Sequence, residues 1–301
     1  MGIDLTGISI AVIGGDRRHL VLMPELVRLG ARVRAAGFTA CDALQQVELV
    51  DDLEAAVANA QVLILPVQGT DPEGNIRALA SNVELRLTPS IARLVPTGTI
   101  LIIGAAREFM RNWATAYGWK LLEIMEMDDV AILNAIPSAE GAIQIAMEQL
   151  PITVHGSQSF VLGFGRVGKT LARMLGGIGA KTTIAARKSA DLARIFEMGW
   201  RPVPFSQLQD FIHEAEIIFN TVPQLVLDEK MLSLLRQDTL IVDLAAYPGG
   251  TDFKTAKKQG IAAILSPGLP GKVAPATSGK ILAQVVPPLI LRELPQCYLR
   301  G

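Results

Sequence analysis

The glycine-rich segment FVLGFGRVG limits the fold of this chain more than any other stretch. An apolar run leads into Gly163, Gly165 and Gly168 at G-x-G-x-x-G spacing, and the helix-like segment KTLARMLGGIGA follows. In dinucleotide-binding folds these glycines make a tight turn, let the backbone approach a pyrophosphate and let the helix pack on its strand. The sequence therefore predicts a dinucleotide site that includes Arg166 and Val167. A purely structural strand-to-helix turn is the alternative.

Apolar strand-like runs alternate with helical ones along the chain, which indicates βαβ units around parallel sheets. The first series contains ISIAVIG, ARVRAAGF, VLILPV and TILIIG, and the second contains SFVLGFG, TTIAARK, EIIFNTV, LIVDLAA and AAILSPG. A chain of 301 residues is long enough for two domains. We predict an α/β protein with two doubly wound Rossmann-like domains and mainly parallel sheets, joined by a bridging helix and a C-terminal crossing helix.

One of the two predicted domains is built from two separate segments of the chain. An N-terminal Rossmann-like domain for substrate or partner is expected at 1–137, with a C-terminal helix at 284–301 that returns to it. An NADP-binding Rossmann domain is expected at 138–283.

Local signals define the two linking helices. Ser138 is expected to cap the start of the bridging helix. Thr277 or Ser278 is expected to cap the final helix, and Pro287 and Pro288 to interrupt it.

Composition excludes several classes of function. The net charge of −1 and the lack of a basic run give no reason to expect nucleic acid. The two cysteines, Cys41 and Cys297, lie far apart without metal-ligand spacing, which predicts a reducing cytoplasm, no disulfide framework and no metal site. No secretory leader is expected, and the apolar runs are shorter than the ~20 residues that span a bilayer, so no membrane partner is expected either.

The second strand of the predicted cofactor domain selects the dinucleotide. An NAD site usually has Asp or Glu about 20 residues after the fingerprint, but this chain has Arg187, Lys188 and Ser189 there. Because a guanidinium can hold a 2′-phosphate and a carboxylate would repel it, NADP is favoured over NAD. A solvent-facing basic turn is the alternative. A Thr-x-Pro loop expected beside the same dinucleotide comprises Thr221, Val222 and Pro223.

The first strand also ends in glycines, but IGGDRRHL departs from the fingerprint. Gly14 and Gly15 are adjacent, and His19 stands where the third glycine would fall. A second cofactor is therefore not expected there. The charged residues that follow lie at the carboxyl end of a strand, the usual ligand position in open α/β sheets. We expect this end to hold substrate or partner, with a solvated loop as the alternative.

Several unusual strings together resemble those of the dipicolinate synthase A-subunit family. They cover nearly the whole chain and read IGGDRR, DDVAILNAIPSAEGAIQIAM, VLGFGRVGKTLAR, ARIFEMG, FNTVP, DLAAYPGGTDF and PGLPGKVAPATSGKIL. The chain departs from the family at Ala245, Ala246 and Tyr247, where a DLASKPGG-like turn has Ser and Lys, and at Ser278, where Ala is commoner. If that family lysine helps to bind substrate, Tyr247 alters substrate affinity or orientation.

The resemblance implies an NADP-dependent oxidoreductase subunit. Its reaction would oxidise a dihydro- or tetrahydrodipicolinate-type cyclic diacid to dipicolinate, pyridine-2,6-dicarboxylate. It further implies that the partner is a flavoprotein-like B subunit and that the protein is located in the mother-cell cytoplasm of a sporulating bacterium, and a homo-oligomer is compatible with it. Two alternatives stay open. One is another NADP-dependent two-domain reductase, and the other is a nucleotide-binding or scaffolding subunit with the chemistry in the flavoprotein.

A dianionic substrate needs cations, and the oxidation needs one proton acceptor. The expected carboxylate-binding residues, each at or near a predicted strand end, are Arg17, Arg18 and Arg107. The expected catalytic residues are Asp16, His19, Asp243 and Lys272.

Overall fold

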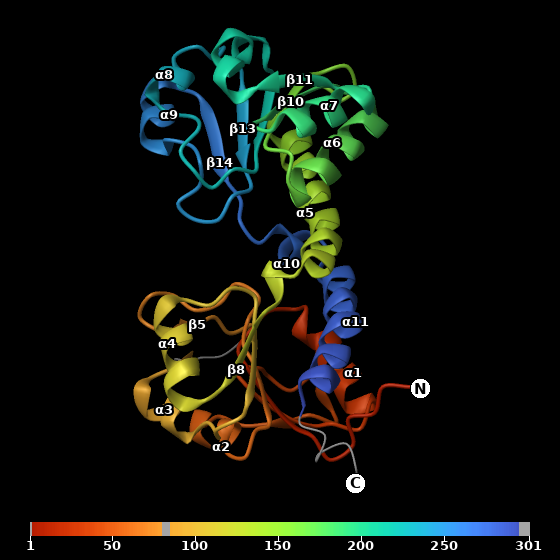
Figure 1. Ribbon diagram of the computed structural model, residues 1–301, viewed down its shortest axis with the longest axis vertical. Helices are drawn as coiled ribbons and strands as arrows, with labels where there is room; N and C mark the ends of the chain where they lie inside the picture. The colour runs from red at the N-terminus through yellow and green to blue at the C-terminus, as the bar shows by residue number, and fades with distance from the viewer. Residues whose placement is uncertain (1, 80–84, 295–301) are drawn as a thin grey trace. The chain divides into compact units, whose positions relative to one another are not determined.

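The computed structural model describes residues 2–79 and 85–294, and the chain divides into two units (Figure 1). Unit 1 comprises residues 1–131 and 274–301, and unit 2 comprises residues 132–273. Unit 2 thus begins and ends earlier in the chain than the predicted 138–283, because the bridging helix enters unit 2 after its first turn and the final helix belongs to unit 1 from its start. The last part of the predicted crossing helix, from residue 295 onward and including Cys297, lies outside the described residues.

Each unit contains a six-stranded parallel sheet, in the order β3-β2-β1-β4-β7-β8 in unit 1 and β11-β10-β9-β12-β13-β14 in unit 2. This is the strand order of a doubly wound fold, so the predicted architecture is confirmed. The strands of unit 1 are β1 (Ser9–Ile13), β2 (Arg32–Ala36), β3 (Glu48–Leu49), β4 (Val62–Ile64), β7 (Ile100–Ile103) and β8 (Lys120–Glu123). Those of unit 2 are β9 (Gln158–Leu162), β10 (Lys181–Ala186), β11 (Arg201–Pro204), β12 (Ile217–Asn220), β13 (Leu240–Asp243) and β14 (Ala262–Leu265).

Helices cover both sheets, and unit 1 has an extra antiparallel pair, β5 (Asn75–Ile76) and β6 (Leu85–Arg86). The helices of unit 1 are α1 (His19–Arg28), α2 (Leu53–Val57), α3 (Pro89–Leu94), α4 (Glu108–Tyr117) and α11 (Pro275–Glu293). Those of unit 2 are α6 (Arg166–Ile178), α7 (Ser189–Glu197), α8 (Glu229–Leu232), α9 (Phe253–Gln259) and α10 (Leu269–Val273), while α5 (Asp128–Gln149) begins in unit 1 and continues in unit 2.

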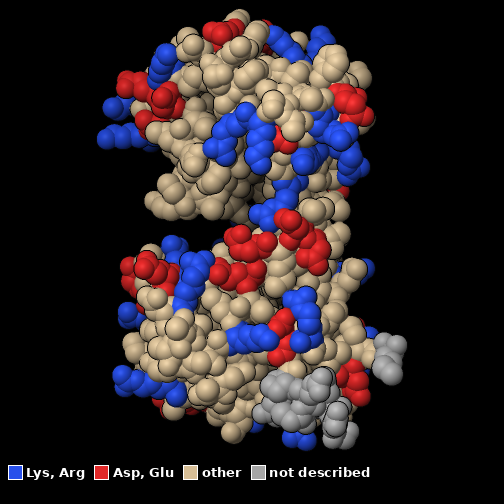
Figure 2. All heavy atoms as spheres, viewed as in Figure 1, with Lys and Arg blue, Asp and Glu red and all other residues tan. Residues whose placement is uncertain are grey.

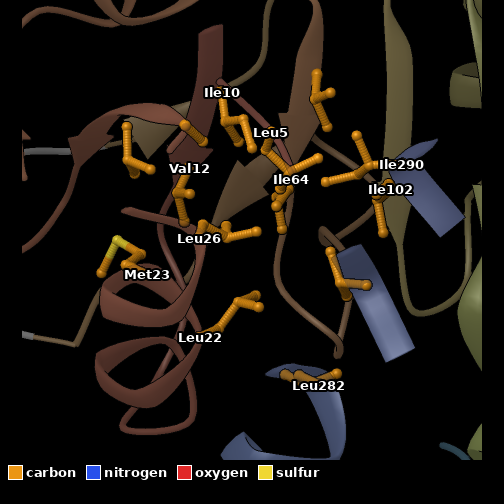
Figure 3. Packing of buried hydrophobic residues seen from close by; sticks show 14 of the residues in the cluster. Leu5, Ile10, Val12, Leu22, Met23, Leu26, Ile64, Ile102, Leu282 and Ile290 are labelled. Carbon is orange, nitrogen blue, oxygen red and sulfur yellow. The ribbon is translucent and has the colours of Figure 1, made fainter. Parts of the chain in front are cut away.

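The core of unit 1 joins the start of the chain to α11. Leu22 and Leu26 of α1 face the sheet and share one apolar cluster with Leu282 and Ile290 of α11 (Figure 3). Each fully buried leucine contributes roughly 1.5–3 kcal/mol relative to an exposed one. The two helices approach closely at Gly279, where a Cβ would lie 2.8 Å from the carbonyl oxygen of Arg18. Unit 1 therefore depends on a segment that follows unit 2 in the sequence.

Helix α5 begins earlier than the sequence predicts, so the expected cap at Ser138 is wrong. Ser138 lies inside the helix, and its hydroxyl donates to the carbonyl of Asn134 one turn earlier, at 2.9 Å. The side chain therefore bonds within the helix and does not cap a helix start. By length and composition alone, α5 could cross a membrane. Its apolar character is accounted for by small side chains, including Ala139, Ala142 and Ala146, that pack into the core of unit 2.

Helix α11 begins and continues differently from the prediction. Ala274 is its N-cap residue, ahead of the expected Thr277 or Ser278, because Pro275 at the first helical position already has the required φ. The helix also continues through Pro287 and Pro288. The carbonyls that lose their usual partners there belong to partly or fully exposed residues, where water can replace the missing N–H groups.

Candidate dinucleotide-binding site

The glycine loop of unit 2 has the geometry that a dinucleotide needs. It connects the buried strand β9 to α6, and Gly165 is the N-cap residue of that helix. A Cβ at Gly168 would overlap the carbonyl oxygen of Gly163, so the helix can pack this closely only with glycine there. A Cβ at Gly165, in contrast, would have no atom within 4 Å. The space above this exposed glycine is therefore open, which fits a pyrophosphate against the first amides of α6.

The Thr-x-Pro loop lies against the glycine loop, as its predicted role requires. A Cβ at Gly163, whose φ is +102°, would lie 2.5 Å from the Thr221 hydroxyl oxygen. Thr221 donates through that hydroxyl to the Leu162 carbonyl at 2.8 Å, which fixes the loop to the end of β9. The buried Asn220 side chain bonds both the N–H and the carbonyl of Val222. Pro223 follows and is exposed.

Asp243 has a structural role that the predicted role as proton acceptor does not match. Its side chain is completely buried at the end of β13. Its carboxylate accepts from the N–H groups of Ala245 and Gly250, at 3.0 and 2.9 Å, and from the Thr251 hydroxyl at 2.7 Å. Buried carboxylates need such partners, and these bonds close the turn that carries the exposed Tyr247. Asp243 therefore shapes the loop and has no open path to a substrate proton.

The basic turn after β10 lies next to the glycine loop. The N–H of Gly163 donates to the carbonyl of Ala185 at 3.0 Å, and the chain continues from there past the end of β10. The side chains of Arg187, Lys188 and Ser189 are all exposed at that point. A carboxylate is absent from this turn, so the residues present are suited to the 2′-phosphate of NADP.

The first glycine turn of unit 1 lacks the open space found in unit 2. A Cβ at Gly14 would meet Ile76 and the Arg77 carbonyl, both from the β5–β6 segment. The N–H of Gly15 donates to that same Arg77 carbonyl at 2.7 Å. The Gly15 amide that a phosphate would use is therefore already paired with a backbone carbonyl.

Three residues beyond that turn, Asp16, Arg18 and His19, form an internal cluster, which does not match their predicted roles. Arg18 is 2% exposed and donates through Nε and Nη2 to the Asp16 carboxylate, at 2.7 Å for the shortest contact. His19 is 1% exposed, and its Nδ1 accepts from the Asp16 N–H at 3.1 Å. Burial raises the pKa of Asp16, but hydrogen bonds with His19 and Arg18 and the charge of Arg18 lower it well below its ordinary value overall.

This cluster changes three of the sequence-based predictions. The lowered pKa makes Asp16 a weak base, the burial of His19 keeps its ring from substrate, and Arg18 is already paired. Spacing along the chain placed these residues correctly at a strand end but did not reveal that they bind one another.

The exposed cations of the predicted site are Arg17 and Arg107 in unit 1 and Lys272 in unit 2. Arg107 follows β7, and its Nε donates to the Thr70 carbonyl at 3.2 Å. Sequence reasoning missed Arg77, which belongs to the β5–β6 segment. Its carbonyl accepts from the Gly15 N–H just after β1, and its side chain is exposed. No simple signal could have found it, because its strands are two residues long. In the described part of the chain, no group of three or more His, Cys, Asp or Glu could hold a metal ion.

Two family models match the chain. Residues 9–125 match the model for the N-terminal domain of the dipicolinate synthase A subunit, and residues 138–246 match "D-isomer specific 2-hydroxyacid dehydrogenase, NAD binding domain". The second match covers the glycine loop, the basic turn and the Thr-x-Pro loop. Unit 2 is therefore an NAD(P)-binding dehydrogenase-like domain.

Comparisons over the whole chain give relatives of the same kind. The A subunit of dipicolinate synthase from Bacillus subtilis (strain 168) is 41% identical over 287 residues, covering 95% of this chain and 97% of the relative. The crystal structure of the corresponding A subunit from Bacillus halodurans has a TM-score of 0.91 at 37% identity, covering 95% of this chain and 99% of the other. A transhydrogenase from Sinorhizobium meliloti has a TM-score of 0.68 at 14% identity, covering 94% and 92%, and so shares the fold alone.

Proposed function

Because the chain belongs to the dipicolinate synthase A-subunit family, we propose that it is an NADP-dependent dehydrogenase subunit that oxidises a dihydro- or tetrahydrodipicolinate-type diacid. The observation that carries this proposal is the open glycine loop beside the exposed Arg187, Lys188 and Ser189. A dihydropyridine-2,6-dicarboxylate and NADP⁺ would give pyridine-2,6-dicarboxylate, NADPH and a proton, with the nicotinamide supplying the hydride acceptor. The aromatic product makes the hydride loss favourable, so positioning is the main task of the protein.

Recognition of the diacid is assigned to arginines of unit 1. Arg17, Arg77 and Arg107 are exposed near the carboxyl ends of its strands, and a guanidinium can bind a carboxylate through two parallel hydrogen bonds. Lys272 is the remaining exposed member of the predicted catalytic set. We further propose that the partner is a flavoprotein-like B subunit and that the two meet in the mother-cell cytoplasm of a sporulating bacterium.

A second function has specific support. Asp16, His19 and Asp243 are all engaged inside the protein, so three of the four predicted catalytic residues are not available to a substrate. This favours a subunit that binds nucleotide and substrate while a flavoprotein partner supplies the chemistry.

Turnover by the purified chain tests the two functions against each other. With the cyclic diacid and NADP⁺, a dehydrogenase subunit is expected to form NADPH on its own, measured by its ultraviolet absorbance. Turnover that begins only when the flavoprotein is added would support the scaffolding role. If NADPH never forms in either mixture, the proposed oxidation is excluded.

Arg187→Ala is expected to weaken NADP binding by at least about tenfold and NAD binding by less than about twofold, because the lost pair of charge-assisted bonds involves only the 2′-phosphate. Titration calorimetry with both dinucleotides measures the two affinities. Arg194→Ala, which removes an exposed guanidinium from α7, is the matched control, since Arg194 pairs with Glu197 on the helix surface. Equal weakening of NAD and NADP would contradict the assignment of Arg187.

A further inference from the structure

We propose that a basic cavity in unit 2 binds a second ligand of the nucleotide class, a planar ring that carries at least two phosphate charges. The cavity has a volume of about 580 Å³ and is lined by Arg173 and Gly176 of α6, Lys181 of β10, and Trp200 and Arg201 at the start of β11. This volume lies within the range of ~300–1,000 Å³ that small-molecule sites occupy. Nothing in the proposed dehydrogenase function uses this cavity.

In the part of the chain that the structure describes, two of the three cationic side chains that line the cavity are not paired with a carboxylate. No hydrogen bond or ion pair joins the side chains of Arg173 or Lys181 to another of the described residues. Arg201 is paired with Glu214, and none of the described residues that line the cavity is Asp or Glu. Figure 2 shows Lys and Arg side chains on the part of unit 2 that contains α6 and α7, with some Asp and Glu among them. Arg173 and Lys181 line the same cavity and are suited to a ligand with adjacent negative charges, because charge-assisted hydrogen bonds to phosphate are strong.

An aromatic wall gives the cavity a place for a ring. Trp200 is held edge-to-face against Phe164, with centroids 6.3 Å apart and an interplanar angle of 73°. A Cβ at Gly176 would lie 3.0 Å from the indole Nε1, so the glycine makes room for the Trp200 ring in this position. Met198 also lines the cavity and is 48% exposed. A planar ligand can cover this apolar surface while its phosphates contact the cations.

Trp200 of the cavity wall contacts Phe164 of the glycine loop, but the cations of the cavity lie away from that loop. Gln158 and Lys181 are the first residues of β9 and β10, whereas the loop follows the last residue of β9. A strand of this length spans roughly 16 Å at about 3.3 Å per residue. A dinucleotide pyrophosphate at the loop therefore cannot be the anion that the cavity cations contact.

The experiment is a calorimetric titration of ADP into the whole chain that has first been saturated with NADP. ADP is expected to bind under these conditions, and Arg173→Gln/Lys181→Gln is expected to weaken that binding by at least about tenfold. Lys257→Gln/Lys258→Gln, which removes two exposed charges from α9, is the matched control and should leave ADP affinity unchanged. Adenosine and inorganic pyrophosphate, titrated separately, should each bind more weakly than ADP.

The results that would overturn the cavity site are distinct from those that bear on the dehydrogenase. ADP binding that disappears when NADP is saturating, or that is equal in the parent and in Arg173→Gln/Lys181→Gln, excludes the site. If NADP itself fails to bind, the same variants are compared without it, and their difference still decides the question. NADP affinity should be unchanged in Arg173→Gln/Lys181→Gln, whereas it should fall in Arg187→Ala.

Discussion

Gly165→Val is expected to abolish dinucleotide binding, with a loss of about a hundredfold or more in affinity, or roughly 3 kcal/mol. A valine side chain would fill the open space above the loop, where a pyrophosphate has to approach the backbone. No protein atom lies within 4 Å of the new Cβ, so the cost in unfolding free energy should be only about 1 kcal/mol, from the poorer N-cap residue. Calorimetric titration with NADP and thermal unfolding of the same sample measure the two effects.

Gly177→Val is the matched control for this substitution. Gly177 lies in the same helix, and a Cβ there also has no neighbour within 4 Å, but it lies away from the helix start. The control should keep the parental affinity for NADP. Unchanged NADP binding in Gly165→Val would remove the cofactor site from this loop.

Asp16→Asn is expected to lower the free energy of unfolding by about 3 kcal/mol, the low end of the cost of breaking a buried ion pair. The substitution leaves the guanidinium of Arg18, which is 2% exposed, without its carboxylate partner. Chemical denaturation measures the change. The double variant Asp16→Asn/Arg18→Met should recover most of the loss, because it also removes the buried charge. A single variant as stable as the parent would show that the pair does not stabilise unit 1.

The same pair predicts how stability depends on pH. Burial opposes the shift, but hydrogen bonds with His19 and Arg18 lower the pKa of Asp16 in the folded protein. A carboxyl whose folded-state pKa is depressed stabilises the protein above the unfolded-state pKa, near 4, and that contribution is lost as the pH falls further. The parent should therefore lose stability below about pH 4, and Asp16→Asn should lose less over the same range. Unfolding curves at a series of acidic pH values provide the comparison.

The sequence predicted the long central strands well, because strands such as β9 and β13 are apolar runs bounded by glycine or polar residues. It missed β11, whose sequence RPVP contains two prolines. Proline cannot donate to a ladder and is tolerated only at an edge, and β11 is the edge strand of its sheet. The extended conformation of β11 therefore depends on its pairing with the neighbouring strand, which the local sequence pattern does not reveal.

The sequence predicted the position of the cofactor site better than it predicted the catalytic residues. The glycine fingerprint acts through backbone geometry that the spacing itself specifies, so its location followed from the sequence. Whether a charged side chain faces solvent or another side chain depends on tertiary contacts. Asp16, Arg18 and Asp243 each have partners that no spacing rule reveals, and Arg77 reaches the end of β1 only through a short antiparallel segment.

The return of α11 to unit 1 affects how the chain can fold as it is synthesised. All of unit 2 lies between the two segments that build the core of unit 1. The ribosome releases residues 132–273 before Leu282 and Ile290 exist outside it, so unit 2 can complete its sheet first. Until α11 is made, the part of the unit 1 core that Leu282 and Ile290 cover stays open, and a nascent chain that stops before residue 275 should expose it to chaperones and proteases.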